Sequence, residues 1–207
     1  MRILAIAALV ATLATPVLAN ADTVNLLVNG GFEATAQGNG SWNIYANLPG
    51  WTGGAAGVEL RNNVAGTASE GQNFVELDTT VNSSITQNVA TINGAHYDLN
   101  FTYSPRAGVG AASNGIEVLW NNQSLGTIAQ QGGSGDNWQS FHFDVTGAAS
   151  SSSLSFRAVG SSDGLGGSLD NVRLTSAVPE PETYAMMLAG LGAIGLMARR
   201  KKAVKLG

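Results

Sequence analysis

The feature that most constrains this sequence is a two-residue alternation of apolar and polar side chains. It is clearest in residues 96–103, where Tyr97, Leu99, Phe101 and Tyr103 alternate with polar residues. This period predicts a β-strand with one face in a core, because an amphipathic helix would repeat every 3.6 residues instead. The other segments expected to form strands are residues 25–28, 58–61, 74–77, 85–89, 116–120, 125–128, 141–145, 154–158 and 170–174.

Turn-forming residues separate these segments and support an all-β fold. Asn-Gly, Pro-Gly and Asn-Asn pairs lie between the expected strands, and the 27 glycines fall mostly in such places. Residues 22–176 show no convincing helical period, and the chain has 0 Cys, so disulfides cannot stabilise it. Many short strands in one domain of this length predict an antiparallel β-sandwich of the jelly-roll type, which leaves few exposed sheet edges.

The first 21 residues read as a secretory signal peptide. Arg2 supplies a positive end, residues 3–13 an apolar stretch, and residues 17–21 a small-residue cleavage site. An N-terminal anchor helix is the weaker alternative, because Thr and Pro residues interrupt the apolar stretch. We therefore expect export, with a mature domain that begins near residue 22.

The C-terminus has three parts in a fixed order. Residues 177–183 form a linker that contains Pro-Glu-Pro, residues 184–198 are apolar and uncharged, and residues 199–207 begin with four basic residues. We expect a single transmembrane helix over 184–198 and a cytoplasmic tail after it, because a basic cluster stops transfer and stays inside. The residues in question are Pro179, Glu180 and Pro181 in the linker and Arg199, Arg200, Lys201 and Lys202 in the tail.

This order resembles the PEP-CTERM sorting signal of Gram-negative bacteria, in which the Pro-Glu-Pro element is the recognition site of a membrane-embedded exosortase. The resemblance implies an exosortase as partner and transient anchoring in the inner membrane. It also implies a final place at the cell surface or in the extracellular (biofilm) matrix. The alternative is a plain C-terminal membrane helix, which has no need of two prolines around a glutamate.

Charge excludes one class of partner. Residues 22–176 hold 12 acidic residues and only 4 arginines, and every lysine lies in the C-terminal tail. Binding to nucleic acid requires a basic face that neutralises phosphates. We therefore expect no nucleic-acid partner.

Several segments resemble the galactose-binding-like jelly rolls found in carbohydrate-binding modules. They are residues 25–33 (NLLVNGGFE), 48–51 (LPGW), 57–60 (GVEL) and 169–174 (LDNVRL), with residues 103–106 and 114–118 extending the likeness. The resemblance implies a calcium ion near the join of the first and last strands, held by Glu33 and Asp170. Backbone carbonyls would then complete the 6 to 8 oxygen ligands that calcium takes.

The strand pattern gives a separate reason to consider Asp170. It shares parity with Val172 and Leu174, which predicts a carboxylate on or near the inward face of the last strand. A buried carboxylate is costly unless it is paired or metal-bound. The alternative to calcium is that Asp170 caps a turn or pairs with an arginine.

Aromatic residues suggest where a sugar could stack. Trp42, Tyr45 and Trp51 lie in a Gly, Asn and Pro-rich segment expected to be a loop, where binding residues concentrate, whereas Trp120 is in phase with core residues. The candidate glycan-binding residues are Trp42, Trp51, Glu59, Arg61 and Arg106, the last three as polar contacts.

Evidence for catalysis is thin. The sequence has no nucleophile-elbow, zinc-protease or phosphate-loop motif, and both histidines, His96 and His142, take outward strand positions. We therefore expect an exported, non-catalytic glycan-binding protein of the cell surface or matrix. The alternatives are a structural or adhesive protein without sugar binding, and a glycoside hydrolase or esterase that uses a pair of carboxylates.

Overall fold

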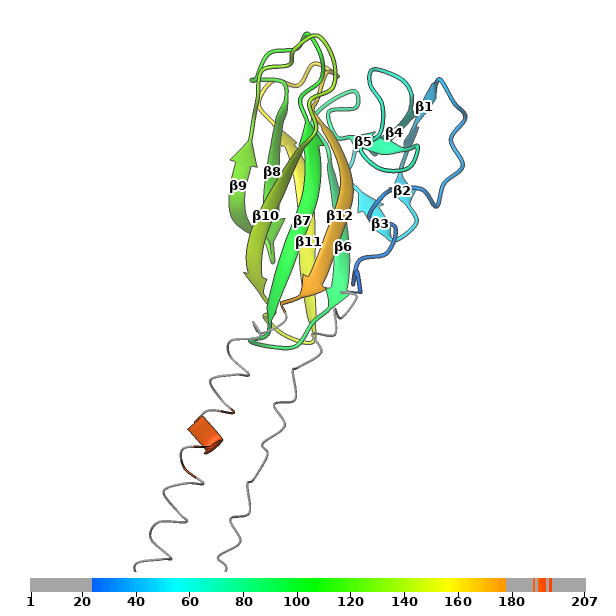
Figure 1. Cartoon of the computed structure of the whole chain (residues 1–207). Helices are drawn as coiled ribbons and strands as arrows, with labels where there is room; N and C mark the ends of the chain where they lie inside the picture. The colour runs from blue at the N-terminus through cyan, green and yellow to red at the C-terminus, as the bar shows by residue number, and fades with distance from the viewer. Residues whose placement is uncertain (1–23, 178–187, 189, 193, 195–207) are drawn as a thin grey trace, which may run out of the picture.

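The computed structural model describes residues 24–177 together with residues 188, 190–192 and 194. These residues form two six-stranded sheets that pack face to face, and every pair of neighbouring strands is antiparallel (Figure 1). The first sheet has the order β1-β4-β5-β12-β7-β10 and the second the order β2-β3-β6-β11-β8-β9. The predicted antiparallel β-sandwich is therefore confirmed.

The twelve strands alternate between the two sheets along much of the chain. Their bounds are β1 (Ser41–Tyr45), β2 (Asn47–Leu48), β3 (Trp51–Gly53), β4 (Val58–Asn62), β5 (Phe74–Glu76), β6 (Ser84–Ala90), β7 (His96–Ser104), β8 (Gly115–Trp120), β9 (Gln123–Ile128), β10 (Gln139–Thr146), β11 (Ser151–Val159) and β12 (Ser168–Ser176).

The terminal segments predicted from the sequence lie largely outside the described residues. This holds for the signal peptide, for Pro179, Glu180 and Pro181, for the basic cluster, and for most of the expected transmembrane helix. Within the part of the chain that the structure describes, no helix is long and apolar enough to cross a membrane.

The core lies between the sheets and follows the two-residue alternation. In β7, Tyr97, Leu99, Phe101 and Tyr103 are buried, and the register pairs Phe101 with Phe141 of β10. The Phe101 ring also meets Phe156 of the second sheet edge-on, with ring centroids 5.0 Å apart. Burying an aromatic side chain of this kind stabilises the fold by about 1.5–3 kcal/mol, so contacts across the layers hold the sandwich together.

The strand predicted at residues 25–28 is absent, although this segment lies along both sheets. Side-chain amides take the place of a backbone ladder there. Asn25 accepts the Leu174 N–H at 2.9 Å and donates to the Val172 carbonyl at 3.1 Å, while Gln87 bonds both the N–H and the carbonyl of Val28. The segment has the apolar pattern of a strand. Among the described residues, however, only one backbone hydrogen bond, from the Leu26 N–H to the Leu174 carbonyl, joins it to a strand.

Strands β1 to β3 lie where the sequence predicted a loop. β1 is an edge strand whose residues are exposed or half-buried, so its side chains show no buried alternation, and β2 and β3 are only two and three residues long. Trp42 and Tyr45 therefore lie in an edge strand rather than a loop, and Trp51 begins β3.

A β-bulge in β12 changes the predicted position of Asp170. The register shifts between Asp170 and Arg173, and Asn171 adopts a left-handed backbone with φ of 48°. The extra residue keeps Leu169 and Val172 in the core and moves Asp170 to the outer face of the first sheet, opposite Thr102. The prediction of an inward-facing Asp170 is therefore wrong, although the side chain is fully buried beneath neighbouring backbone.

Candidate functional site

The outer face of the first sheet carries most of the predicted polar site. Residues directly opposite each other in an antiparallel pair point to the same side. Trp42 is opposite Arg61, Arg61 is opposite Phe74, and Glu59 is opposite both Ile44 and Glu76. We call the surface formed by Trp42, Ile44, Glu59, Arg61, Phe74 and Glu76 the β1–β4–β5 face.

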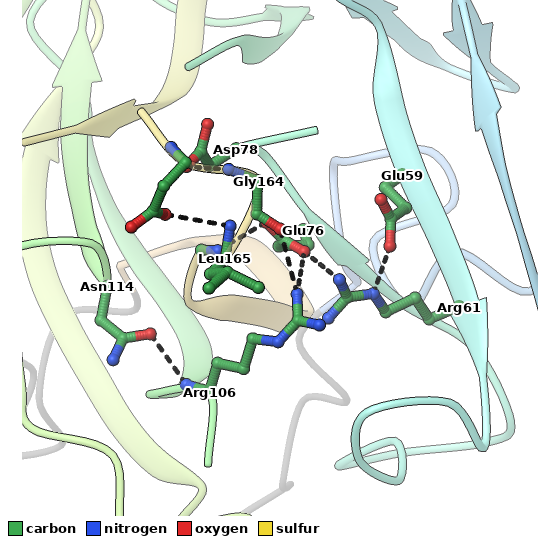
Figure 2. Close-up of polar contacts among 10 residues, drawn as sticks. Glu59, Arg61, Glu76, Asp78, Arg106, Asn114, Gly164 and Leu165 are labelled. Carbon is green, nitrogen blue, oxygen red and sulfur yellow. Dashed lines mark hydrogen bonds and ion pairs between the residues drawn. The ribbon is translucent and has the colours of Figure 1, made fainter. Parts of the chain in front are cut away.

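A network of ion pairs occupies the centre of this face (Figure 2). Arg61 Nε lies 2.5 Å from Glu59 Oε1, and Arg61 Nη2 pairs with Glu76 Oε2. Arg106 Nη1 reaches the same Glu76 oxygen at 3.2 Å, and the Gly166 N–H donates to Glu76 Oε1 at 2.6 Å. Two guanidinium groups from different elements therefore converge on one carboxyl group.

The network is mostly buried, but one of its arginines is accessible to solvent. Glu76 is fully buried and Arg61 is 2% exposed, whereas 21% of the Arg106 side chain is accessible. Arg61 Nη1 is buried and has no hydrogen-bond partner among the described residues. The network therefore retains an unused donor next to an arginine that solvent reaches.

Burial changes the proton affinity of the network. It raises the pKa of Glu76 to about 8, against the opposing effect of Arg61 and Arg106. Burial also lowers the pKa of Arg106, and the neighbouring Arg61 charge adds to that effect. An arginine stays protonated in proteins, so the network holds two cationic groups, of which Arg106 is accessible to solvent.

Backbone packing fixes Arg106 in the loop after β7. The Asn114 side chain accepts the Arg106 N–H at 2.8 Å and donates to the Val109 carbonyl at 3.0 Å. Gly132 lies so close that a Cβ there would come within 1.8 Å of the Arg106 carbonyl oxygen. The loop is thus held by buried contacts, which limits the positions open to the guanidinium group.

Aromatic side chains flank the network on both sides. Trp42 is 50% exposed and Ile44 is 39% exposed on the edge strand. Beyond Phe74, the half-buried Trp138 meets the Phe74 ring edge-on at 5.9 Å and donates its indole N–H to the Thr67 carbonyl. The face therefore combines an accessible aromatic platform with fixed hydrogen-bond donors.

The structure brings together four of the five predicted glycan-binding residues. Trp42, Glu59 and Arg61 share the β1–β4–β5 face, and Arg106 joins them through Glu76. Trp51 does not, because it is 2% exposed in the core, with its ring 5.8 Å from that of Phe32. Its predicted role as a stacking platform is therefore wrong, whereas the core position predicted for Trp120 is confirmed.

Sequence reasoning gave no role at this site to Glu76 or Trp138. The contacts of Glu76 with Arg61 and Arg106 span 15 and 30 residues of sequence, so no local pattern reveals them. Trp138 follows a Gly, Ser, Asp and Asn-rich stretch, the same loop signal that drew attention to Trp42.

A pocket of about 380 Å³ lies beside the predicted calcium ligands. It is lined by Asn25, Asn29, Gly31, Glu33, Glu70, Gly71, Asn171, Val172 and Arg173. Three non-glycine residues in or next to it have left-handed backbones, namely Asn29, Phe32 and Asn171. Such strained backbones persist where the surrounding structure fixes them and are enriched at functional sites.

Glu33 and Asn171, the chain neighbour of Asp170, both line this pocket. Burial raises the pKa of Asp170 to about 7, and the Glu33 charge adds to the increase. Asp170 accepts the N–H groups of Ser69, Glu70 and Asn171, and Glu33 Oε1 accepts those of Gln72 and Asn73. These carboxylates already hold the 69–73 segment through backbone donors, and calcium binding here stays a prediction.

Comparison with known proteins identifies both parts of the chain. Residues 177–202 match the PEP-CTERM protein-sorting motif, which confirms the predicted sorting signal and agrees with an exported, surface-associated protein. Residues 25–175 match a second family, described as Protein of unknown function (DUF642).

Individual relatives are similar over about three quarters of the chain. A Multifunctional-autoprocessing repeats-in-toxin protein of Vibrio cholerae serotype O1 is 34% identical over 154 residues, or 73% of this chain, but the chain spans only about 3% of that protein's length. An arabinose-bound α-L-arabinofuranosidase structure (MgGH51) has a TM-score of 0.51 at 13% identity, covering 73% of this chain and 26% of that one.

A carbohydrate-binding module structure is also similar. Family 16 Carbohydrate Binding Module-2 matches with a TM-score of 0.49 at 16% identity, over 73% of this chain and all of that one. The two-sheet architecture of the described residues is itself the all-β sandwich that the sequence predicted. Because its family match spans nearly all of the sandwich, the chain belongs to the DUF642 family.

Proposed function

We propose that this protein is an exported, non-catalytic glycan-binding protein that uses the β1–β4–β5 face. A sugar ring offers an apolar face of axial hydrogens and an edge of hydroxyls, so a site needs an aromatic platform beside fixed polar groups. One observation carries the proposal: the half-exposed Trp42 lies directly opposite Arg61, whose buried Nη1 has no partner in the described structure.

The polar groups of this face suit the hydroxyl edge of a sugar. Arg106 is held by Glu76 and by the Gly164 carbonyl, so its remaining N–H groups are directed before a ligand arrives. Preorganised donors reduce the entropy cost of binding. Arg106, with 21% of its side chain accessible, is the member of the network that a sugar hydroxyl can reach.

The state of the carboxylates supports a non-catalytic role. Glu59 and Glu76 lie opposite each other, as a pair of glycosidase carboxylates would, but both are at least 95% buried. Both Glu76 oxygens already accept hydrogen bonds from Arg61, Arg106 and Gly166. A general acid or nucleophile must reach the substrate, and these groups do not face solvent.

The sorting motif supports a place outside the cell. We infer that an exosortase of a Gram-negative inner membrane recognises Pro179, Glu180 and Pro181 after transient anchoring, with Arg199, Arg200, Lys201 and Lys202 as the cytoplasmic stop. The sandwich would then reach the cell surface or extracellular matrix, where it could bind an extracellular polysaccharide.

Retention on polysaccharide gels and glycan arrays tests the proposal. Trp42→Ala removes the platform and should cost on the order of 1–3 kcal/mol by analogy with base stacking, or about ten- to a hundredfold in affinity. Arg106→Ala should weaken binding in the same direction. Trp42→Tyr keeps an aromatic face and should retain most of the affinity.

Ile92→Ala provides the matched control, because Ile92 is 73% exposed and lies outside the β1–β4–β5 face. Thermal melts establish that each variant is folded. If Trp42→Ala and Arg106→Ala are folded and bind as the parent does, the site lies elsewhere. If the parent binds no glycan, a structural or adhesive role replaces the proposal.

A further inference from the structure

A separate group of polar side chains lies at the other edge of the first sheet, on β7 and β10. His142 Nε2 is 3.1 Å from Asp98 Oδ1 and 3.6 Å from Asp144 Oδ1. One ligand atom from each of the three residues lies within 4.8 Å of the others. Strand β12 separates these strands from the β1–β4–β5 face.

The register places this group on the outer face of the sheet. Asp144 is directly opposite Asp98, and His142 is directly opposite Asn100, one pair further along the ladder. Phe141 and Phe143, the chain neighbours of His142, pack against the core and anchor β10 beneath the group. Two adjacent strands thus fix three ligand-bearing residues, and strands hold a site more firmly than loops do.

The spacing of the three side chains fits a small cation. Ligand atoms about 2.1 Å from a tetrahedral zinc ion lie about 3.4 Å from each other, and the two measured separations fall on either side of that value. Like charges directly opposite on neighbouring strands, as in Asp98 and Asp144, are destabilising. A cation between them would remove that repulsion.

The donor atoms indicate which class of ion to expect. One imidazole nitrogen with two carboxylate oxygens suits zinc and neighbouring divalent transition metals, whereas calcium and magnesium take oxygen ligands. The side chains are accessible, at 49% for His142 and 80% for Asp144, so water can fill a remaining coordination position. Three protein ligands and an open position are typical of a zinc site that exchanges ligands.

We propose that Asp98, His142 and Asp144 bind one divalent transition-metal cation, with zinc as the probe ion. This site is independent of the proposed glycan site, since the two share no residue. The ion would cross-link the edge strand β10 to β7 and would leave one position for water or for an oxygen atom of a partner molecule.

Isothermal titration of the full chain with zinc, purified without an affinity tag and freed of metal with a chelator, tests the site. We expect one ion per chain and a melting temperature that rises with zinc concentration. His142→Ala should weaken binding at least tenfold, because even the loss of a group that only supports a ligand costs about 10- to 100-fold. Asp98→Asn should act in the same direction.

The other histidine provides a matched control. His96 lies on the same face, with Nδ1 3.5 Å from Thr146 Oγ1, but outside the three-residue group. His96→Ala should leave zinc binding unchanged, and calcium should not compete for the site. Zinc binding that survives His142→Ala, zinc affinity that falls equally in His96→Ala, or no binding by the parent would overturn the assignment.

Discussion

Replacing Trp51 by alanine distinguishes the two roles that a tryptophan can have in this fold. The Trp51 ring is 2% exposed, with centroids 5.8 Å from Phe32 and 6.5 Å from Phe156. Truncation of a buried tryptophan to alanine costs about 3–5 kcal/mol. The indole N–H also donates to the Asn29 carbonyl at 3.0 Å, but that carbonyl keeps the Phe32 N–H, so the lost hydrogen bond adds little.

The expected loss is large enough to measure by two methods. Each kcal/mol shifts the melting temperature of a domain of this size by about 2–4 °C, so Trp51→Ala should melt about 6–20 °C below the parent. Urea unfolding followed by far-UV circular dichroism should give the same free-energy loss with an unchanged m-value. Trp42→Ala should stay within about 0.5 kcal/mol of the parent, because its side chain is half-exposed at a sheet edge.

The opposite outcome would refute this account of the core. If Trp51→Ala loses less than about 1 kcal/mol and also loses glycan retention, Trp51 contacts ligand rather than Phe32 and Phe156. The two tryptophans would then have exchanged the roles that the structure gives them.

Three further predictions concern pH, metal and sorting. Burial raises the pKa of Glu76 from 4.5 to about 8, so its contribution to the free energy of unfolding is complete below pH 4.5 and is lost as the pH rises through 8. In the parent, the urea concentration at the midpoint of unfolding should therefore fall between pH 4.5 and pH 8, and Glu76→Gln should reduce that fall. An equal fall in the variant would contradict the prediction. If Glu33 and Asp170 hold calcium, adding calcium to chelated protein should raise the melting temperature, and Asp170→Asn should abolish that rise. Replacing Pro179, Glu180 and Pro181 by alanine should leave a longer, membrane-retained form on immunoblots of cell fractions, and unchanged size and distribution would contradict the sorting role.

The sequence predicted those strands whose partners bury every second residue. β7 is the clearest example, since Leu99 and Phe101 alternate with half-buried polar residues in the structure as in the sequence. The edge strand β1 has no buried alternation, so no local pattern could reveal it. Segment 25–28 has the pattern of a strand, but Asn25 and Gln87 replace its backbone ladder with side-chain amides that local periodicity does not report.

The sequence could point to several residues of the candidate site, but it could place residues together on one face only where they are close in sequence. Glu59 and Arg61 are two apart, so strand geometry alone places them on one face. Their partners Glu76 and Arg106 come from β5 and from the loop after β7, and the pairing of those elements is a long-range property. The bulge at Asn171 likewise reverses the parity of Asp170, and a left-handed asparagine leaves no reliable trace in an alternation of apolar residues.

The β1–β4–β5 face is better explained by ligand positioning than by stability. Desolvating two arginines and two glutamates is expensive, and well-packed apolar residues often serve a fold as well as a buried ion network does. Here Arg61 Nη1 has no hydrogen-bond partner among the described residues, and the Arg106 side chain is partly accessible to solvent. Neither feature adds to stability. Glu59 and Glu76 fix Arg61 opposite Trp42, and Glu76 also holds Arg106, so the cost of ordering these groups is met during folding rather than during binding. Under the proposed function, the arrangement gives up some stability in return for a rigid donor next to an aromatic surface.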